Sequence, residues 1–339
     1  MKLFEAYRIK DLELKNRVVM PPMCMFSAVN ESIADQTHFV HYATRAAGGV
    51  GLIIIEATAV SPEGRIEPQD LGIWNDEQKD ALRKIVDECH RYGAKMALQI
   101  AHAGRKGFDR EHIVAPSPLP FSSNSGTPHE LTRDEILQKV NDFKTAALRT
   151  VEAGFDMIEV HAAHGYLNHE FLSPLSNHRT DEFGGSLENR VRLLKLILEG
   201  IKETIPSHIP VGIRVSASDY ATGGIDVHEM VKIVNSIKSY IDIVHVSSGG
   251  LTENPPQAYP GYQVEFSRII KEQCDIPTIT VGLIDSADLA DEILENGRAD
   301  LVALGRALLR NPYWVLNVAH KRQIDRFIPK MYERGFKGF

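Results

Sequence analysis

Three consecutive segments decide the fold: GLIIIEAT at residues 51–58, DEQKDALRKIVDECHRY at 76–92 and KMALQIA at 95–101. The first and third are short runs dominated by apolar residues, which is typical of parallel strands that are covered on both faces. The middle segment places its apolar residues at helical spacing, with charged residues between them. Together the three segments predict a strand, a helix and a second strand parallel to the first.

The same alternation extends outward to both ends of the chain. Apolar strand candidates lie at residues 17–20, 51–58, 95–101, 157–161, 211–216, 241–247, 278–281 and 301–304. Amphipathic helix candidates follow them at residues 38–47, 76–92, 132–153, 187–204, 227–239, 265–273, 286–295 and 307–319. Eight such units in order predict an α/β fold of the TIM (β/α)8 barrel type. The pattern alone leaves an open, doubly wound sheet as the alternative.

Three segments lie outside the repeat. Residues 1–16 contain alternating apolar and polar positions, which predict a small hairpin that closes the N-terminal mouth of the barrel. Residues 104–131 form a long loop rich in Pro, Ser and Gly after the third strand, and loops of that length are usually functional. A tail follows from residue 329 to 339. Since no linker interrupts the pattern, we expect a single domain over residues 1–339.

Composition indicates an ordinary globular protein. Hydrophobic residues make up 43% of the chain and charged residues 24%, and the net charge of −7 gives no reason to expect nucleic acid or an anionic membrane as a partner. Cys24, Cys89 and Cys274 fit no disulfide framework or metal spacing. The N-terminus lacks a signal-peptide pattern, and no apolar run approaches the roughly 20 residues of a membrane helix. We therefore expect a cytoplasmic protein.

In barrel enzymes, functional side chains come from the loops at the C-terminal ends of the strands. The residues at these positions offer many hydrogen-bonding groups but almost no carboxylates. They are Pro21, Pro22, Met23, Cys24, Ala57, Thr58, Gln99, His102, His161, His164, Arg214, Ser248, Gly249, Gly282, Gly305 and Arg306. Such a set suits a planar, polar, anionic ligand better than a divalent metal ion.

The last two strand ends carry the pattern of a phosphate site. Gly282 and Gly305 let a ligand approach the backbone closely, and Arg306 offers a bidentate phosphate partner. Alternatively, Gly305 only turns the chain and Arg306 is a solvated residue at a helix start. Arg214 lies in an otherwise apolar strand, where its guanidinium requires either an anionic ligand or a structural salt bridge. No G-x-G-x-x-G motif opens a strand–helix unit, so a Rossmann-type dinucleotide site is not expected.

A pair of histidines, His161 and His164, follows the fourth strand. A metal site needs a further ligand, and the first strand lacks the His-x-His of many barrel hydrolases, so we interpret these imidazoles as hydrogen-bond donors to a substrate oxygen. Tyr166 could serve as a proton donor. The alternatives are structural roles for all three residues, and an inert buried thiol for Cys24.

At this point several motifs resemble those of the Old Yellow Enzyme family, in its bacterial, thermophilic-like NADPH dehydrogenase (ene-reductase) branch, over essentially the whole chain. The motifs are KNRVVMPPMCM at 15–25, DLGIWN at 70–75, QIAHAGRK at 99–106, EVHAAHGYL at 159–167, HEFLSPLSNHRTDEFGGSLENR at 169–190 and YERGF at 332–336. The resemblance implies a barrel with bound FMN, with NADPH or NADH as a transient hydride donor, which reduces the activated C=C bond of α,β-unsaturated aldehydes and ketones.

The resemblance also implies roles for individual residues. FMN would contact Pro21, Pro22, Met23, Cys24, Ala57, Gln99, Arg214, Gly305 and Arg306, and the strand-end residues Ser248, Gly249 and Gly282 complete the predicted cofactor site. His161 and His164 would bind the activating oxygen of the substrate, and Tyr166 would donate a proton. Arg334 would reach the active site of a neighbouring subunit in a homodimer or homotetramer. No metal is implied.

One position departs from the family pattern. Where this branch usually carries a tyrosine that helps to hold the substrate, the chain has Phe26. The ring is retained but the hydroxyl is lost, which removes a hydrogen bond worth about 0.5–1.5 kcal/mol. Other functions that the sequence leaves open are a related flavin barrel acting on other enoyl substrates, a metal-dependent barrel hydrolase that uses His161 and His164, and a barrel without catalytic activity.

Overall fold

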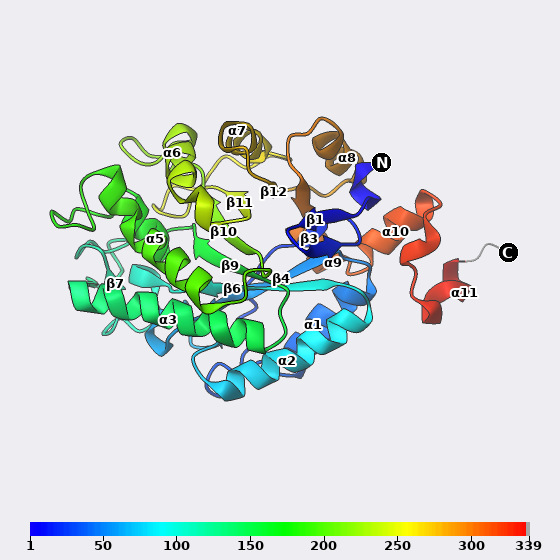
Figure 1. Cartoon of the computed structure of the whole chain (residues 1–339), viewed down its shortest axis with the longest axis horizontal. Helices are drawn as coiled ribbons and strands as arrows, with labels where there is room; N and C mark the ends of the chain where they lie inside the picture. The colour runs from blue at the N-terminus through cyan, green and yellow to red at the C-terminus, as the bar shows by residue number, and fades with distance from the viewer. Residues whose placement is uncertain (337–339) are drawn as a thin grey trace.

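The computed structural model describes residues 1–336, and a closed parallel barrel forms its core (Figure 1). The barrel strands are β3 (Val18–Met20), β4 (Leu52–Ala59), β6 (Lys95–Ala101), β9 (Met157–Ala162), β10 (Val211–Ser216), β11 (Ile243–Ser247), β12 (Thr278–Thr280) and β13 (Leu301–Ala303). All of them pair in parallel, and β3 pairs with both β13 and β4, so the sheet closes on itself. The short strand β5 (Leu71–Gly72) adds to β4. The expected TIM barrel is confirmed, and the open sheet is excluded.

Helices surround the barrel in the order that the sequence predicts. They are α1 (Gln36–Ala47), α2 (Asp76–Arg91), α3 (Arg133–Glu152), α4 (Leu167–Leu172), α5 (Leu187–Thr204), α6 (Val227–Ile237), α7 (Val264–Cys274), α8 (Ala287–Glu295), α9 (Gly305–Arg310) and α10 (Trp314–Lys321). Short 3₁₀ helices lie at η1 (Lys2–Phe4), η2 (Pro62–Gly64), η3 (Gly104–Lys106), η4 (Lys238–Tyr240), η5 (Asp325–Phe327) and η6 (Lys330–Tyr332).

Local chemistry explains where several helices begin and end. Thr132 and Glu135 form a reciprocal capping box at the start of α3. The single helix expected at residues 307–319 is wrong, because the chain is extended at Asn311 and divides the segment into α9 and α10. Pro312 accounts for the break, since proline disfavours helical geometry in the residue before it. The six-residue helix α4 was not expected.

The N-terminal hairpin is present as predicted. Strands β1 (Tyr7–Ile9) and β2 (Leu12–Leu14) pair antiparallel. Their buried side chains pack in one cluster with the apolar side chains of the barrel interior. The cluster contains Ile9, Leu12, Leu14, Val19, Leu52, Ile54, Ala97, Met157, Ile243, Ile279, Leu301 and Ala303. The hairpin therefore closes the N-terminal end of the barrel, which leaves the C-terminal strand ends as the open face.

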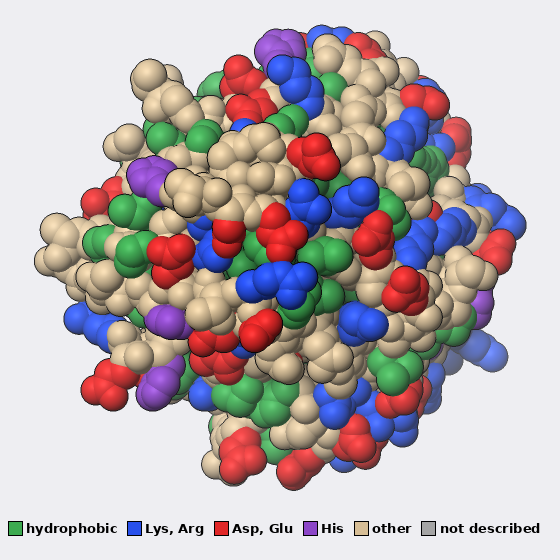
Figure 2. Space-filling model, turned by 60° about the vertical axis from the view of Figure 1, so that its left-hand side comes forward, with side chains coloured by type: hydrophobic (Ala, Val, Ile, Leu, Met, Phe, Trp, Pro, Cys, Tyr) green, Lys and Arg blue, Asp and Glu red, His purple; other side chains and the backbone are tan. Residues whose placement is uncertain are grey.

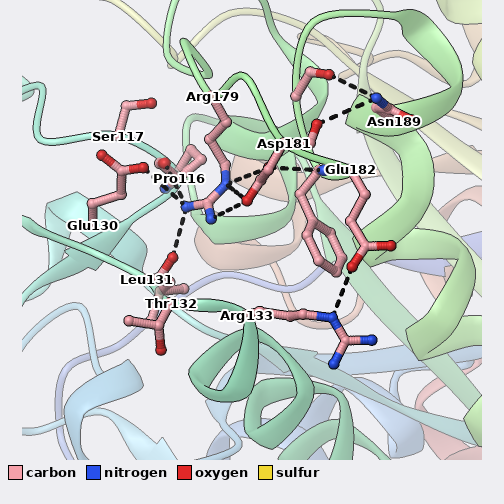
Figure 3. A network of polar contacts seen from close by, with 12 residues as sticks. Pro116, Ser117, Glu130, Leu131, Thr132, Arg133, Arg179, Asp181, Glu182 and Asn189 are labelled. Atoms are coloured by element: carbon pink, nitrogen blue, oxygen red, sulfur yellow. Dashed lines mark hydrogen bonds and ion pairs between the residues drawn. The ribbon is translucent and has the colours of Figure 1, made fainter.

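The long loop after β6 is held in place by a buried arginine (Figure 3). Nη1 of Arg179 donates to the carbonyls of Pro116 at 3.0 Å and Leu131 at 2.6 Å. These residues directly follow the short parallel strands β7 (Val114–Ala115) and β8 (His129–Glu130). Its guanidinium also pairs with the carboxylate of Asp181 at 2.6 Å. Arg179 belongs to the longest family-like motif, residues 169–190, so this motif contains the residue that holds the long loop in place.

The C-terminal segment packs on the outer side of the molecule. Figure 1 shows α11 (Glu333–Phe336) beyond α10, at the edge of the fold. The hydroxyl groups of Tyr332 and Tyr313 lie 3.3 Å apart, and the ring of Phe336 meets that of His320 edge to face. Residues 337–339, the end of the predicted tail, lie outside the described part of the chain.

One face of the molecule carries both acidic and basic side chains (Figure 2). Figure 2 shows red and blue side chains interspersed on the face that it presents, with no broad area of one sign. Within residues 1–336, no helix combines the length and apolar character that a membrane crossing requires.

Candidate active site

A cavity of about 240 Å³ opens at the C-terminal ends of the strands. It is lined by residues from the loops after β3, β10, β11, β12 and β13. They are Pro21, Pro22, Met23, Arg214, Ser247, Ala258, Tyr262, Gln263, Val281, Gly282, Leu283, Ile284, Asp285, Gly305 and Arg306. Much of the predicted cofactor site therefore converges on one cavity, from strand ends that are distant in sequence.

Glycine is required at one point of this lining. Gly282 follows β12 and has a φ angle of +129°, which L side chains rarely adopt. A Cβ atom there would lie 3.1 Å from both Nε2 of Gln263 and the ring of Tyr262. Gly305 lies at the start of α9, and Arg306 beside it is exposed. This side of the cavity thus offers accessible backbone and the exposed guanidinium of Arg306, for which no side-chain ion pair is found within residues 1–336.

Arg214 is the buried cation of the site. It lies within β10, two residues before the end of the strand, and is 8% exposed. Among the described residues, its guanidinium makes one hydrogen bond, a 3.4 Å contact from Nη1 to the carbonyl of Pro22. Nε has no partner within the described chain. Burial lowers the pKa of Arg214, and the charge of Glu159 opposes that shift. A buried guanidinium with unpaired donors on a cavity wall is suited to an anionic or strongly accepting ligand.

Beneath Arg214 lies a carboxylate that sequence reasoning missed. Nε2 of Gln99 donates to Oε1 of Glu159 at 2.8 Å, and Nδ1 of His245 lies 2.9 Å from Oε2. Glu159 is fully buried inside the barrel. Its position two residues before His161 on β9 could have indicated an inward side chain, because strand residues alternate between faces. These contacts fix the orientation of the Gln99 amide. Among the described residues, no donor bonds to the amide oxygen Oε1 of Gln99, so it can accept a hydrogen bond from a ligand.

His161 is held as a neutral donor. Its Nδ1 accepts a hydrogen bond from the backbone N–H of Ala163 at 3.2 Å, which places the ring proton on Nε2. Burial holds the pKa values of His161 and His164 well below the usual range, and the charge of Arg214 adds to the effect. The rings of the two histidines meet edge to face with centroids 5.3 Å apart.

His164 occupies a constrained turn. Its φ angle is +58°, its backbone N–H donates to Oγ of Ser216 at 2.9 Å, and its Nε2 lies 2.8 Å from Oγ of Ser247. Two glycines let this turn approach the loop after β11: a Cβ atom on Gly165 would lie 2.3 Å from the carbonyl oxygen of Gly250. The imidazole is therefore positioned by the backbone as well as by its own hydrogen bonds.

Tyr166 follows the histidines at the N-cap of α4. Its half-buried ring lies edge to face against His161, with centroids 5.0 Å apart. Burial raises its pKa, and the neighbouring Cys24 raises it further. The phenol therefore keeps its proton at neutral pH and can release it only to a strongly basic acceptor. Within residues 1–336, no three His, Cys, Asp or Glu side chains are grouped as a metal site would need.

The segment after β3 continues along the rim. Burial raises the pKa of the half-buried Cys24 thiol, and Asp70 and Glu56 raise it further. The buried carboxylate of Glu56 accepts the backbone N–H of Met25 at 2.8 Å, and burial raises its pKa to about 7. Phe26 is 42% exposed and adopts a φ angle of +50°. Cys24 is thus a protonated thiol rather than a thiolate.

Several other predicted residues do not line this cavity. Ala57 is buried on β4, next to Glu56. Oγ of Ser248 donates to Oε1 of Gln263 at 2.7 Å, and the backbone N–H of Gly249 donates to the carbonyl of Ser218. Arg334 is exposed on α11 and does not line the cavity of its own chain.

The structure adds site residues that the sequence did not indicate. Ser247, Tyr262, Gln263 and Asp285 line the cavity from segments without a motif. Lys106 contacts the loop of the two histidines, and its place in the QIAHAGRK motif was the available signal.

Comparisons with known proteins agree with this geometry. The model of the NADH:flavin oxidoreductase / NADH oxidase family matches residues 2–325. The chain is 54% identical to the NADPH dehydrogenase of Clostridium acetobutylicum over 339 residues, which cover 99% of this chain and 100% of that protein. It is 48% identical to the NADPH dehydrogenase of Bacillus subtilis over 338 residues, 99% of both proteins. Among solved structures, morphinone reductase superposes with a TM-score of 0.81 at 30% identity, over 93% of this chain and 89% of that one. The chain therefore belongs to the NADH:flavin oxidoreductase / NADH oxidase family, which is the Old Yellow Enzyme family that its motifs resemble, and it is a flavoprotein oxidoreductase.

Proposed function

We propose that this enzyme binds FMN and uses NADPH or NADH to reduce the activated C=C bond of α,β-unsaturated aldehydes and ketones, and also nitro compounds. The observation that carries the proposal is Arg214, a buried guanidinium with an unpaired Nε on the wall of a cavity that neutral histidines adjoin. Family membership and the names of the relatives support this function over a metal-dependent hydrolase or an inactive barrel. A related flavin barrel acting on other enoyl substrates is the nearest alternative.

The residues present fit a flavin mononucleotide. Gly282, Gly305 and Arg306 offer close backbone approach and a cation for the phosphate, and Arg214 offers a cation for the flavin ring. The remaining contacts would come from Pro21, Pro22, Met23, Cys24, Ala57, Gln99, Ser248 and Gly249. When bound, the flavin supplies hydride chemistry between the nicotinamide and the alkene.

The histidine side of the site would hold and activate the substrate. His161 donates from Nε2, and His164 offers a second imidazole, so that a carbonyl oxygen between them gains hydrogen bonds as negative charge develops. Donors that are already oriented in a water-poor pocket give the largest electrostatic stabilisation. Tyr166 would then give its proton to the α-carbon, which is basic enough to take it.

Cys24 would tune the flavin rather than act as a nucleophile. A buried thiol whose pKa is raised remains protonated and is a weak nucleophile. Cys24→Ala should therefore retain turnover and shift the reduction potential of the flavin. The relative rates of flavin reduction by NAD(P)H and flavin reoxidation by the alkene should change accordingly. Complete loss of turnover with flavin still bound would indicate covalent catalysis instead.

We also propose that residues 329–339 form an interface tail through which Arg334 completes the site of a neighbouring subunit, in a homodimer or homotetramer. Its exposed position on α11, away from its own cavity, supports that role. Mixing Arg334→Ala and Tyr166→Phe variants should create hybrid sites with both residues intact, so activity should exceed the mean of the parents. Activity at the mean, with subunit exchange verified, would contradict sharing.

The cofactor tests the proposal directly. The purified protein should be yellow, and the cofactor released by heat should elute as FMN on chromatography, because the cavity offers one phosphate site and the fold has no second nucleotide-binding motif. The reduced form should then be reoxidised by an enone such as cyclohexenone under anaerobic conditions. Release of FAD, or a flavin that NAD(P)H reduces but no enone or nitro compound reoxidises, would refute the assignment.

A further inference from the structure

Lys106 contacts both His164, which we propose to bind the substrate, and Tyr166, which we propose to donate the proton. It ends the short helix η3, at the start of the long loop after β6. Its Nζ donates to the carbonyl of His164 at 2.9 Å and to the carbonyl of Gly250 at 3.1 Å. The ammonium group therefore joins the histidine turn to the loop after β11, at the point where Gly165 and Gly250 bring their backbones together.

The same ammonium group faces two aromatic rings. Nζ lies 4.8 Å from the ring centroid of Tyr166 and 4.6 Å from that of Phe121. These distances are within the roughly 6 Å over which a cation is attracted to a ring face. The attraction grows when the ring carries negative charge, so the location favours a phenolate on Tyr166 over a neutral phenol.

The surroundings of Lys106 disfavour its positive charge. Burial lowers its pKa to about 8, Glu170 opposes that shift, and Arg105 adds to it. Glu170 is fully buried, and its Oε1 accepts the backbone N–H of Arg105 at 3.0 Å while Oε2 has no partner in the described chain. Burial raises the pKa of Glu170 to about 8. Lys106 also lowers the pKa values of His161 and His164. A half-buried amine beside the cation of Arg105 and two neutral histidines is not explained by stability alone.

We propose that Lys106 is a positioning and electrostatic residue for proton transfer: it fixes the turn of His164 and stabilises the phenolate that Tyr166 becomes. This inference rests on the proposed function. A bound flavin would supply the hydride that the β-carbon receives, with NAD(P)H as its source. The O–H bond of Tyr166 breaks and a C–H bond forms at the α-carbon, which saturates the alkene. The phenolate then recovers a proton from water, while Lys106 keeps its own protons throughout.

The direct test measures the acidity of residue 166 without any turnover. A trifluorotyrosine introduced at position 166 is more acidic than tyrosine, so its ionisation can be followed by fluorine NMR within the stable pH range. Lys106→Gln and Lys106→Met should raise the titration midpoint by about 0.7–1.5 pH units, which corresponds to a fivefold to thirtyfold weaker acid. Lys106→Arg, which retains the charge, should restore most of that shift. The same probe at Tyr240, on the outer element η4, should not respond.

A second measurement links this acidity to the reaction. In single-turnover alkene reduction, Lys106→Gln should slow the rate about fivefold to thirtyfold when Tyr166 is present, and less than about twofold in a Tyr166→Phe background. An equal loss in both backgrounds, or an unchanged fluorine titration in folded variants, would overturn the proposal and leave Lys106 a structural tie. If the native protein reduced no alkene but the titration still shifted, the proposed function would fail while the link between Lys106 and Tyr166 stood.

Discussion

The two halves of the barrel mouth differ in how their polar groups are satisfied. On the side of β10, β12 and β13, Arg214 has an unpaired Nε and Arg306 is exposed beside Gly305. On the side of β9, His161 and His164 are each oriented by a hydrogen bond to the protein. The contrast suggests that the first half derives affinity from groups that a ligand completes, whereas the second half is preorganised for chemistry.

The largest difference between the two halves is expected when His161 is replaced, because the rate of alkene reduction should fall while FMN stays bound. His161→Ala removes an oriented donor from the proposed oxyanion position, and losses of about 10²–10³-fold in rate are usual for such a deletion. Alkene reduction should fall by this factor while the protein still binds FMN. His228→Ala removes an exposed histidine on α6 and is the matched control. Loss of FMN from His161→Ala, with little further loss of rate per bound flavin, would show that the halves are not separate.

Replacement of Arg306 should have the opposite effect: FMN binding should weaken while the rate at saturating FMN changes little. Arg306→Ala removes the proposed charge-assisted contact to the phosphate, so the Kd for FMN should rise about ten- to a hundredfold, measured by flavin fluorescence on reconstitution of the apoprotein. The rate of alkene reduction at saturating FMN should change much less. Arg268→Ala, on α7 and paired only with Glu265 and Glu272 among the described residues, controls for the loss of one positive charge. An unchanged Kd would remove Arg306 from the cofactor site.

The smallest effect is expected at Phe26. Phe26→Tyr restores the hydroxyl that the family pattern carries, and one hydrogen bond should lower KM for a carbonyl substrate about twofold to tenfold. The value of kcat should stay within about twofold, because the new contact is present before and during the reaction. Steady-state kinetics with a substrate panel measure both constants. A change in kcat alone would indicate that Phe26 affects the reaction rather than substrate binding.

Much of the fold was readable because it depends on local patterns. The apolar runs identified the barrel strands, and the helix expected from residue 132 begins at Arg133, within one residue of the prediction. The segment 307–319 failed because Pro312 outweighed its helical periodicity. The site was harder to derive, since Glu159 and Gln263 act through side-chain directions that spacing does not reveal. The rule that barrel enzymes carry their sites at the C-terminal strand ends placed part of the predicted residues on the cavity. The roles of individual residues came from family motifs.

One measurement tests the central claim most directly: anaerobic stopped-flow kinetics of both half-reactions in native enzyme and in Tyr166→Phe. The ring is retained in this variant and only the hydroxyl group, the proposed proton donor, is lost. The account predicts that reoxidation by an enone slows by about 10²–10⁴-fold, the usual contribution of a general acid, while reduction by NADPH slows far less. Reoxidation by a nitro compound, whose product does not need prompt protonation, should be affected less than reoxidation by the enone. An equal decrease in both half-reactions would contradict the account and make Tyr166 a structural residue.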